Sequence, residues 1–555
     1  MQPTKQQQLI LDHDGCAVVI AAPGSGKTFV ISNMIKQKLS KLSEHQGIIA
    51  ISYTNKASNE LKHRSLSNGE NPRFSFFGTI DRFTISDVII PFGKHVFGIP
   101  ASSFRTVKLN ELSVEDVEEI KRLMIDRKVF NQMIEKLGRL FMNGIILIEY
   151  VGLLANYIFS VSQACKAYLK ARYTHIYIDE YQDSGAEQHQ LFLSIKNLGI
   201  KAIAVGDLNQ SIYAFSNKDA KYLKELTKNV DFKYFKLDKN HRCAAGIINY
   251  SNYLLNPKTE LIADEDRPII FTMIDGGNEE IAAWIDKFIE KLKEGFHITD
   301  NNKIAILTRY GRTAVAIDKT LTTPHRYSES NELDKSMNVW ASIFSSLLSF
   351  LFDHNYRFID VVEQVTEYNH LSKVELKRLN QLKKSIEAFR GRPLKELTAL
   401  KETFCEVAKI IALNSVHQDS VLLLNEVLNT PEMLEHYYPT ATNEIHILTL
   451  HKSKGLEYDL IIHLDLHEWA LPAKRPGPGN DFNNPVFENY QQDLNLHYVG
   501  VTRARKACVL ISSTKRVNNT AQVKKGSPSE FLSLNGIEKL RYSKKKEEGN
   551  AKNSS

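Results

Sequence analysis

Residues 21–28, AAPGSGKT, combine residue types at a spacing that can bind phosphate groups. Gly24 and Gly26 allow a tight turn whose N–H groups point at phosphate oxygens. Lys27 can reach the β and γ phosphates, and the Thr28 hydroxyl can bind Mg²⁺. The usual pattern G-x-x-x-x-G-K-[ST] has glycine where this chain has Ala21. The segment nevertheless predicts a nucleoside triphosphate site formed by Ala22, Pro23, Gly24, Ser25, Gly26, Lys27 and Thr28.

Two further segments carry polar groups at the ends of predicted strands. In IDEYQDS, residues 178–184, Asp179 is the candidate Mg²⁺ ligand and Glu180 the candidate general base that orients the attacking water. Acidic residues also end strands as solvated turns, but their place after a phosphate-binding loop favours the catalytic interpretation. In VGDLNQSIYAF, residues 205–215, Gln210 can bond the γ-phosphate or the water. Tyr213 and Phe215 can stack on unpaired bases, or can be core residues.

Apolar runs that alternate with helical stretches predict two parallel-sheet α/β cores around these segments. The runs are residues 16–20, 47–53, 174–178 and 200–205, then 304–307, 445–450, 459–464 and 507–512. Helical periodicity predicts two insertions, residues 84–172 and 353–436. The expected division is 1–83 with 173–238 for the first core, 239–352 with 437–535 for the second, and a disordered tail at 536–555.

Composition places the chain among ordinary globular proteins of several domains. It has 555 residues, a net charge of +7 and 43% hydrophobic residues. This mild positive charge permits a polyanionic partner without requiring one. The five cysteines include no C-x-x-C pair, so neither a zinc site nor a disulfide framework is indicated. No apolar signal segment or membrane span is expected, and a reducing cytoplasm fits the composition.

Segments along both halves follow one another in a recognisable order. They are SYTNKASNELKHR (52–64), GTIDRF (78–83), KNHRC (239–243), TLHKSKGLEYD (449–459) and HYVGVTRARK (497–506), with SPSEFL (527–532) after them. Together with the three segments above, they resemble the motifs of the UvrD/Rep/PcrA-type superfamily 1 DNA helicases. In that family the phosphate-binding loop commonly begins with Ala, as Ala21 does here. The resemblance extends over residues 6–532 and implies a P-loop NTPase with two RecA-like cores.

The resemblance implies a site divided between the cores, with ATP and Mg²⁺ as cofactors. Lys27, Thr28, Asp179, Glu180 and Gln210 would come from the first core, and Arg242 and Arg503 from the second. Contacts with the base and ribose would come from Gln6, His241 and Glu457. The residues implied to contact single-stranded DNA are Tyr53, Thr54, Asn55, Tyr213, Phe215, Thr449 and His451.

The implied activity is ATP-driven 3′→5′ translocation on single-stranded DNA, although some positions depart from the family pattern. His241 stands where the family has an aromatic residue that stacks on adenine, and Ser216 follows Phe215 where the family has arginine. Residues 491–495 lack two arginines that the family has before its last motif. The second insertion is also much shorter than the domain that regulates unwinding in typical members.

Within the family, the sequence is similar to Gabija-type anti-phage helicase subunits. The shared features are IDEYQDS, Asp81 in a G-T-x-D-x-F pattern, and residues 240–252. This resemblance implies a companion TOPRIM-type nuclease in a hetero-oligomer. Two alternatives remain open at this stage. One is a DNA-end-sensing ATPase that activates a partner nuclease with little unwinding, and the other is a DNA repair helicase.

Overall fold

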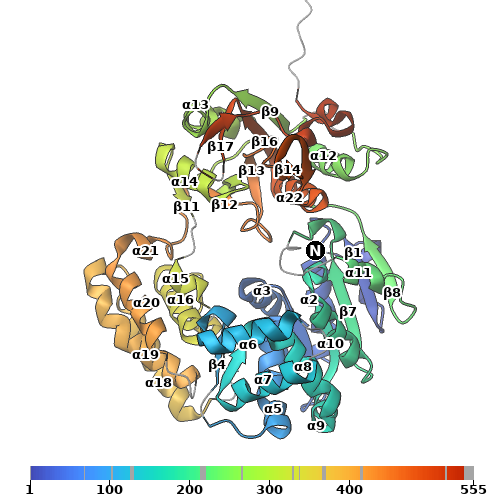
Figure 1. Cartoon of the computed structure of the whole chain (residues 1–555), viewed down its shortest axis with the longest axis vertical. Coiled ribbons are helices and arrows are strands. Elements are labelled where there is room, and N and C mark those ends of the chain that lie inside the picture. The colour runs from blue at the N-terminus through green and yellow to red at the C-terminus, as the bar shows by residue number, and fades with distance from the viewer. Residues whose placement is uncertain are drawn as a thin grey trace, which may run out of the picture.

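The computed structural model contains two sheet-based cores and two helical regions (Figure 1). The described residues are 2–67, 69–101, 104–125, 130–212, 220–263, 267–327, 331–336, 338–365, 371–412, 417–518, 520 and 522–542. Within these ranges, none of the helices has both the length and the apolar character required to cross a membrane. The predicted α/β class with two parallel-sheet cores is confirmed.

The first core is a parallel sheet with the strand order β3-β2-β6-β7-β1-β8. Its strands are β1 (Ala17–Ala21), β2 (Gly47–Ile51), β3 (Phe76–Gly78), β6 (Tyr173–Ile178), β7 (Lys201–Gly206) and β8 (Lys233–Leu237). Helices cover both faces, so the central strands are continuous apolar runs. These helices are α1 (Lys5–Leu11), α2 (Lys27–Leu39), α3 (Asn55–Ser65), α10 (Ala186–Lys196) and α11 (Lys221–Leu226). Because β6, β7 and β1 are adjacent, their carboxyl ends meet at one edge.

The second core repeats this architecture with the order β11-β12-β10-β13-β16-β9. Its strands are β9 (Ile269–Ile274), β10 (Ile304–Thr308), β11 (His325–Tyr327), β12 (Ile445–Thr449), β13 (Tyr458–His463) and β16 (Ala504–Ser513). The helices that pack on it are α12 (Ala245–Leu255), α13 (Asn278–Gly295), α14 (Gly311–Thr320) and α22 (Tyr490–Thr502). Two hairpins, β14 (Lys474–Gly477) with β15 (Asp481–Phe487) and β17 (Lys515–Val517) with β18 (Val523–Lys525), extend from it.

The first insertion is continuous with the first core. It contains α5 (Ile90–Phe97), α6 (Val114–Ile125), α7 (Phe130–Met142), α8 (Val151–Val161), α9 (Gln163–Arg172) and the short strands β4 (Arg105–Val107) and β5 (Ile145–Leu147). Leu137 and Phe141 of α7 belong to the same buried apolar cluster as Ile49 and Ile176 of the sheet. Sliding this insertion over the sheet would therefore disrupt close-packed side chains.

The second insertion has its own apolar core, which extends from Leu333 to Tyr437. Its helices are α15 (Glu332–Lys335), α16 (Val339–Phe352), α17 (Phe358–Glu363), α18 (Lys373–Glu387), α19 (Leu400–Ile411), α20 (Gln418–Asn429) and α21 (Pro431–Glu435). They form a separate lobe in Figure 1. The sequence predicted that α16 belongs to the second core, within residues 239–352, but α16 belongs to the apolar core of the second insertion. α16 carries eight buried residues and packs inside the insertion, because its apolar face matches those of α19 and α20.

Contacts between this second insertion and the first core are polar. Lys62 on α3 forms an ion pair with Glu363, and His63 Nε2 lies 3.0 Å from Asp360 Oδ1. Arg82 Nη2 donates to the Glu363 carbonyl at 2.6 Å. These contacts join α17 to the helices that follow β2 and β3.

Replacing Phe344, which is fully buried in the core of the second insertion, tests whether that insertion is an independent unit. We expect Phe344→Ala to destabilise the insertion by about 3–5 kcal/mol, because it removes a large apolar side chain and leaves a cavity. Hydrogen exchange should show faster exchange in α16, α19 and α20 and unchanged protection in β1 and β6. Val339→Ala, at a position that is 36% exposed on the same helix, is the matched control. Loss of protection in β1 and β6 as well would contradict this independence.

Candidate nucleotide site between the two cores

The predicted phosphate-binding loop lies between β1 and α2, at the carboxyl edge of the first sheet. Gly24 and Gly26 have φ angles of 67° and 85°, in the left-handed region that favours glycine. Gly26 is also the N-cap of α2 and has no side-chain cap. The first N–H groups of α2 are therefore available to an anion.

Lys27 and Glu180 form an ion pair at the centre of the site. Lys27 Nζ lies 3.2 Å from Glu180 Oε1, and their side chains are 12% and 22% exposed. Asp179 directly follows β6 and accepts a hydrogen bond on Oδ1 from the Glu180 N–H at 2.9 Å. Glu180 has a φ of 53°, a conformation that costs about 1–3 kcal/mol for a residue other than glycine. Such strain is concentrated at functional sites, because the surrounding structure must hold it in place.

The pKa values of the adjacent residues Asp179 and Glu180 are shifted in opposite directions. Burial raises the pKa of Asp179, and the neighbouring charge of Glu180 raises it further. Burial acts in the same direction on Glu180, but Lys27 and Lys454 outweigh it and hold the pKa of Glu180 below its usual value. Burial also disfavours the charge of Lys27, yet the nearby carboxylates raise its pKa. Glu180 and Lys27 are therefore held ionised as a pair.

A chain of buried amides links Glu180 to the end of β7. Gln182, which is fully buried, donates to Glu180 Oε2 and accepts the Asp207 N–H at 3.0 Å. Asp207 Oδ2 in turn accepts from Gln210 Nε2 at 2.9 Å. The predicted residue Gln210 is thereby brought to the same site as Glu180. Gln182 and Asp207 were not predicted as site residues, although they lie inside the segments 178–184 and 205–215.

Two arginines reach this site from the second core. Arg503 is 2% exposed, and its Nη2 donates to Gln210 Oε1 at 3.3 Å. Burial and the charge of Arg242 lower the pKa of Arg503 to about 10, so it stays charged at neutral pH. Arg242 Nε lies 2.5 Å from Glu457 Oε2. The structure therefore brings Arg242, Arg503 and Glu457 to the junction where the sequence placed them.

The segment containing His241 packs directly against the phosphate-binding loop. The His241 N–H donates to the Gly24 carbonyl at 2.9 Å, and its side chain is exposed. A Cβ on Gly24 would lie 2.4 Å from Asn240 Oδ1 and 2.6 Å from Arg242 Cβ. This close approach explains why the loop has glycine at position 24.

The structure places Gln7, rather than the predicted Gln6, against the loop. Gln6 Nε2 donates to Asp238 Oδ1 at 2.8 Å. Gln7 is 6% exposed, and its Nε2 donates to the Ser25 carbonyl at 3.1 Å. Thr4 and Gln7 form a capping box at the start of α1. The T-x-x-Q spacing of that box is the sequence signal that distinguishes Gln7 from its neighbours.

The predicted DNA-contact residues come from both cores. Thr54 is exposed and caps α3 by accepting the Ala57 N–H at 3.1 Å. Thr449 ends β12, and His451 follows it in the next turn. Tyr53 lies beside this turn, with its ring 6.0 Å from Lys454 Nζ. Asn55 begins α3, while Tyr213 and Phe215 lie outside the described residues.

The loop and the carboxylates fit the groups that the sequence predicted. Ser25 Oγ is buried without a hydrogen-bond partner among the described residues, as expected in a loop that binds an anion. Asp179 and Thr28 supply carboxylate and hydroxyl oxygens, the donors that Mg²⁺ prefers. The residues are thus suited to a nucleotide with its Mg²⁺.

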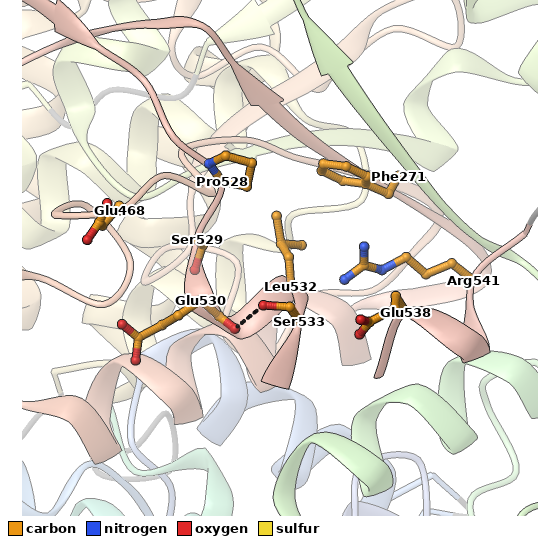
Figure 2. Close-up of a pocket in the computed structure, with 9 residues that line it drawn as sticks. All are labelled: Phe271, Glu468, Pro528, Ser529, Glu530, Leu532, Ser533, Glu538 and Arg541. Carbon is orange, nitrogen blue, oxygen red and sulfur yellow. Dashed lines mark hydrogen bonds between the residues drawn. The ribbon is translucent and has the colours of Figure 1, made fainter. Parts of the chain in front are cut away.

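A separate pocket on the second core, shown in Figure 2, shares no residue with this site. Its volume is about 250 Å³, and Phe271, Glu530, Leu532 and Arg541 contribute to its wall. The Arg541 guanidinium carbon lies 5.0 Å from the centre of the Phe271 ring. The candidate nucleotide site is therefore defined by the loop and the strand ends, not by this pocket.

Comparison with protein families gives matches to both halves of the chain. Residues 6–216 match a model described as an AAA domain, and residues 344–515 match the UvrD-like helicase C-terminal domain. The first match contains the phosphate-binding loop, Glu180 and Gln210, and the second contains Glu457 and Arg503.

Curated relatives are similar over nearly the whole chain. Gabija protein GajB of Bacillus cereus is 26% identical over 93% of this chain and 96% of its own length. ATP-dependent DNA helicase Rep of Buchnera aphidicola is 24% identical over 94% of both chains. ATP-dependent DNA helicase PcrA of Bacillus subtilis is 21% identical over 92% of this chain and 82% of its own length. The chain is therefore similar to ATP-dependent DNA helicases over nearly its whole length, and its second half matches the UvrD-like helicase C-terminal domain.

Proposed function

We propose that this protein is an ATP-dependent DNA helicase that moves 3′→5′ along single-stranded DNA. The observation that carries the proposal is the contact between the cores, in which Arg503 donates to Gln210 at 3.3 Å beside the Lys27–Glu180 pair. A nucleotide on the loop would meet catalytic groups from both cores. Hydrolysis would therefore depend on how closely the cores approach. The likeness to proteins named DNA helicases supports this proposal, and the direction is the one that the family resemblance implies.

The Lys27–Glu180 pair would change partners when ATP binds. The phosphates would attract Lys27, and Glu180 would then be released to orient the attacking water. Mg²⁺ held by Thr28 and Asp179 would neutralise charge on the β and γ phosphate oxygens. Arg242 would likewise exchange Glu457 for a phosphate oxygen, leaving Glu457 for the ribose. His241, with its exposed ring, would stack on the base, while Gln6 stays a proposed base contact.

The DNA strand would lie over both cores. Thr54 belongs to the first core and Thr449 and His451 to the second, so a strand that touches all three would sense their relative movement. Tyr53 would add a stacking surface beside them. Repeated closing and opening of the cores would then advance the strand.

The similarity to Gabija protein GajB leads us to propose a role in anti-phage defence. In this role the protein would act on single-stranded DNA or DNA ends with a TOPRIM-type nuclease in a hetero-oligomer. An alternative is a DNA-end-sensing ATPase that activates the nuclease with little unwinding, which the small second insertion favours. A second alternative, a DNA repair helicase, is favoured by the similarity to Rep and PcrA.

Substituting Lys27 or Glu180 tests the proposed ATPase site. We expect Glu180→Gln to lower kcat by about 10²–10⁴, because the general base is lost while its shape is kept. Lys27→Ala should weaken nucleotide binding as well as turnover. ATP hydrolysis is measured with and without oligo-dT, using Lys41→Ala as the exposed-lysine control. If single-stranded DNA leaves the wild-type rate unchanged, the motor function is contradicted.

Gly24→Ala tests whether the loop must approach the second core's segment closely. We expect a rise in the KM for ATP of at least about tenfold, because the new methyl group would displace Asn240 and Arg242. Gly69→Ala is the control, since Gly69 has a similar φ of +80° with no atom within 4 Å of the added methyl group. An unchanged KM for ATP in Gly24→Ala, or an equal rise in Gly69→Ala, would contradict the close approach as the cause.

Strand displacement distinguishes a motor from an end sensor. We expect the isolated protein to displace a labelled strand from a duplex with a 3′ tail, and not from one with a 5′ tail. Robust ATP hydrolysis at DNA ends without displacement would favour the end sensor. Co-purification of the native protein with the products of neighbouring genes would separate a defence role, with its nuclease, from a repair role.

A further inference from the structure

Asp238 is an exposed residue that has no role in the nucleotide site described above. It directly follows β8, the strand that pairs with β1 and therefore lies beside the phosphate-binding loop. The Ala22 N–H, within that loop, donates to the Leu237 carbonyl at 2.8 Å. The His241 N–H donates to the Gly24 carbonyl at 2.9 Å. Asp238 is thus held between two residues whose backbones are bonded to the loop.

The carboxylate of Asp238 is bonded to the side chain of Gln6 on α1. Gln6 Nε2 donates to Asp238 Oδ1 at 2.8 Å, and the other carboxylate oxygen lies 3.2 Å from Lys236 Nζ. The hydrogen bond from Gln6, together with that from Lys236, outweighs burial and holds the pKa of Asp238 below its usual value. Asp238 is therefore ionised at neutral pH, and an ionised carboxylate can only accept hydrogen bonds.

This contact determines which way the side-chain amide of Gln6 points. A glutamine amide has two different ends, an oxygen that accepts hydrogen bonds and an NH₂ group that donates them. Because Asp238 only accepts, the NH₂ group of Gln6 must face it, and Gln6 Oε1 must face away from it. The flipped amide would instead place two acceptors against each other. Asp238 thus fixes Gln6 Oε1 as a hydrogen-bond acceptor that points away from β8.

The first turn of α1 is anchored to the phosphate-binding loop, so Gln6 is also held in place by its backbone. The neighbouring Gln7 Nε2 donates to the Ser25 carbonyl at 3.1 Å, and a capping box fixes the start of the helix. Asp238 is three residues before His241, whose exposed ring is proposed to stack on the base. The acceptor of Gln6 is therefore held beside the proposed position of the base.

A fixed acceptor at this position distinguishes purine bases by the group on C6. Adenine has an amino group there, which donates, whereas guanine and hypoxanthine have a carbonyl oxygen, which accepts. Gln6 Oε1 would accept a hydrogen bond from the adenine amino group, but it would repel the carbonyl oxygen of the other two bases. The second N–H of Gln6 Nε2 would remain available for N7, which all three bases share. Discrimination would therefore come from Oε1 alone.

We propose that Asp238 is a positioning residue that sets the base preference of the nucleotide site by fixing the orientation of the Gln6 amide. The site then takes purine nucleotides with a C6 amino group and disfavours those with a C6 carbonyl group. The proposal rests on the proposed nucleotide site, with Gln6 as its base contact. Asp238 itself touches neither the base nor the phosphates in this account. Without Asp238, the Gln6 amide is free to present either end to the base.

The test compares adenosine with inosine nucleotides, which differ only in the C6 group and the N1 proton that accompanies it. Calorimetry gives the Kd for ADP and for IDP with Mg²⁺, and hydrolysis with oligo-dT gives kcat and KM for ATP and for ITP. We expect the wild type to bind ADP at least about tenfold more tightly than IDP, as one hydrogen bond gained or lost provides. Asp238→Ala should reduce this ratio to less than about threefold, and the change should appear in KM rather than in kcat.

Further variants separate the fixed amide from a general effect on the site. Asp238→Asn offers Gln6 Oε1 a donor, so the flipped amide forms and the preference should shift toward IDP. Asp238→Glu keeps an acceptor and should keep part of the discrimination. In a double-mutant cycle, adding Asp238→Ala to Gln6→Ala should reduce the ratio no further, because Asp238 acts only through Gln6. The controls Gln8→Ala, on the same helix, and Asp231→Asn, just before β8, change exposed residues and should keep full discrimination.

Three results would overturn the proposal. They are equal Kd values for ADP and IDP in the wild type, full discrimination in Asp238→Ala, and a further loss when Asp238→Ala is added to Gln6→Ala. Failure of the proposed helicase function would look different, because the wild type would then hydrolyse neither ATP nor ITP in response to oligo-dT, whereas the Kd values would still report the base preference.

Discussion

Charged groups that are buried between the two cores must be paired inside the protein, because they cannot be fully hydrated. The ion pair of Lys27 and Glu180 is the central pair of this kind. With side chains 12% and 22% exposed, neither group is fully hydrated, so each stabilises the charge of the other. The Glu180 carboxylate is held by Gln182, which also binds the Asp207 N–H. Asp207 holds Gln210, which meets Arg503. The relative position of the cores thus depends on one continuous set of polar contacts.

Parallel strands bring the members of this set together, and the sequence was informative about those strands. The order β6-β7-β1 places Asp179, Asp207 and the phosphate-binding loop at the same edge. These central strands are continuous apolar runs, so the local sequence pattern was sufficient to predict them. All four edge strands, β3, β8, β9 and β11, were missed, and two of them, β8 and β11, have weak patterns. Three residues of β8 are exposed, and β11 consists of His, Arg and Tyr.

The sequence could name candidate residues where the chemistry is local, but it could not show contacts between residues that are distant in the chain. Lys27, Glu180 and Gln210 are each next to a strand end, and the structure gathers them at one place. Gln6 was named without reference to Gln7, because the T-x-x-Q spacing that marks Gln7 among three consecutive glutamines was overlooked. The contact between Lys454 and Asp183 joins residues 271 positions apart, and no local pattern reports it. Motif order placed Arg503 near the site, but only packing could show that it meets Gln210.

The two insertions are attached to this framework by different forces. The first shares a buried apolar cluster with the sheet, so moving it would open cavities in close-packed material. The second has a separate apolar core and meets the first core through Lys62, His63 and Arg82. Ion pairs of partly exposed side chains contribute little stability and weaken with salt. The second insertion can therefore separate from the first core at low cost, whereas the first insertion must move with the strand ends that hold Glu180.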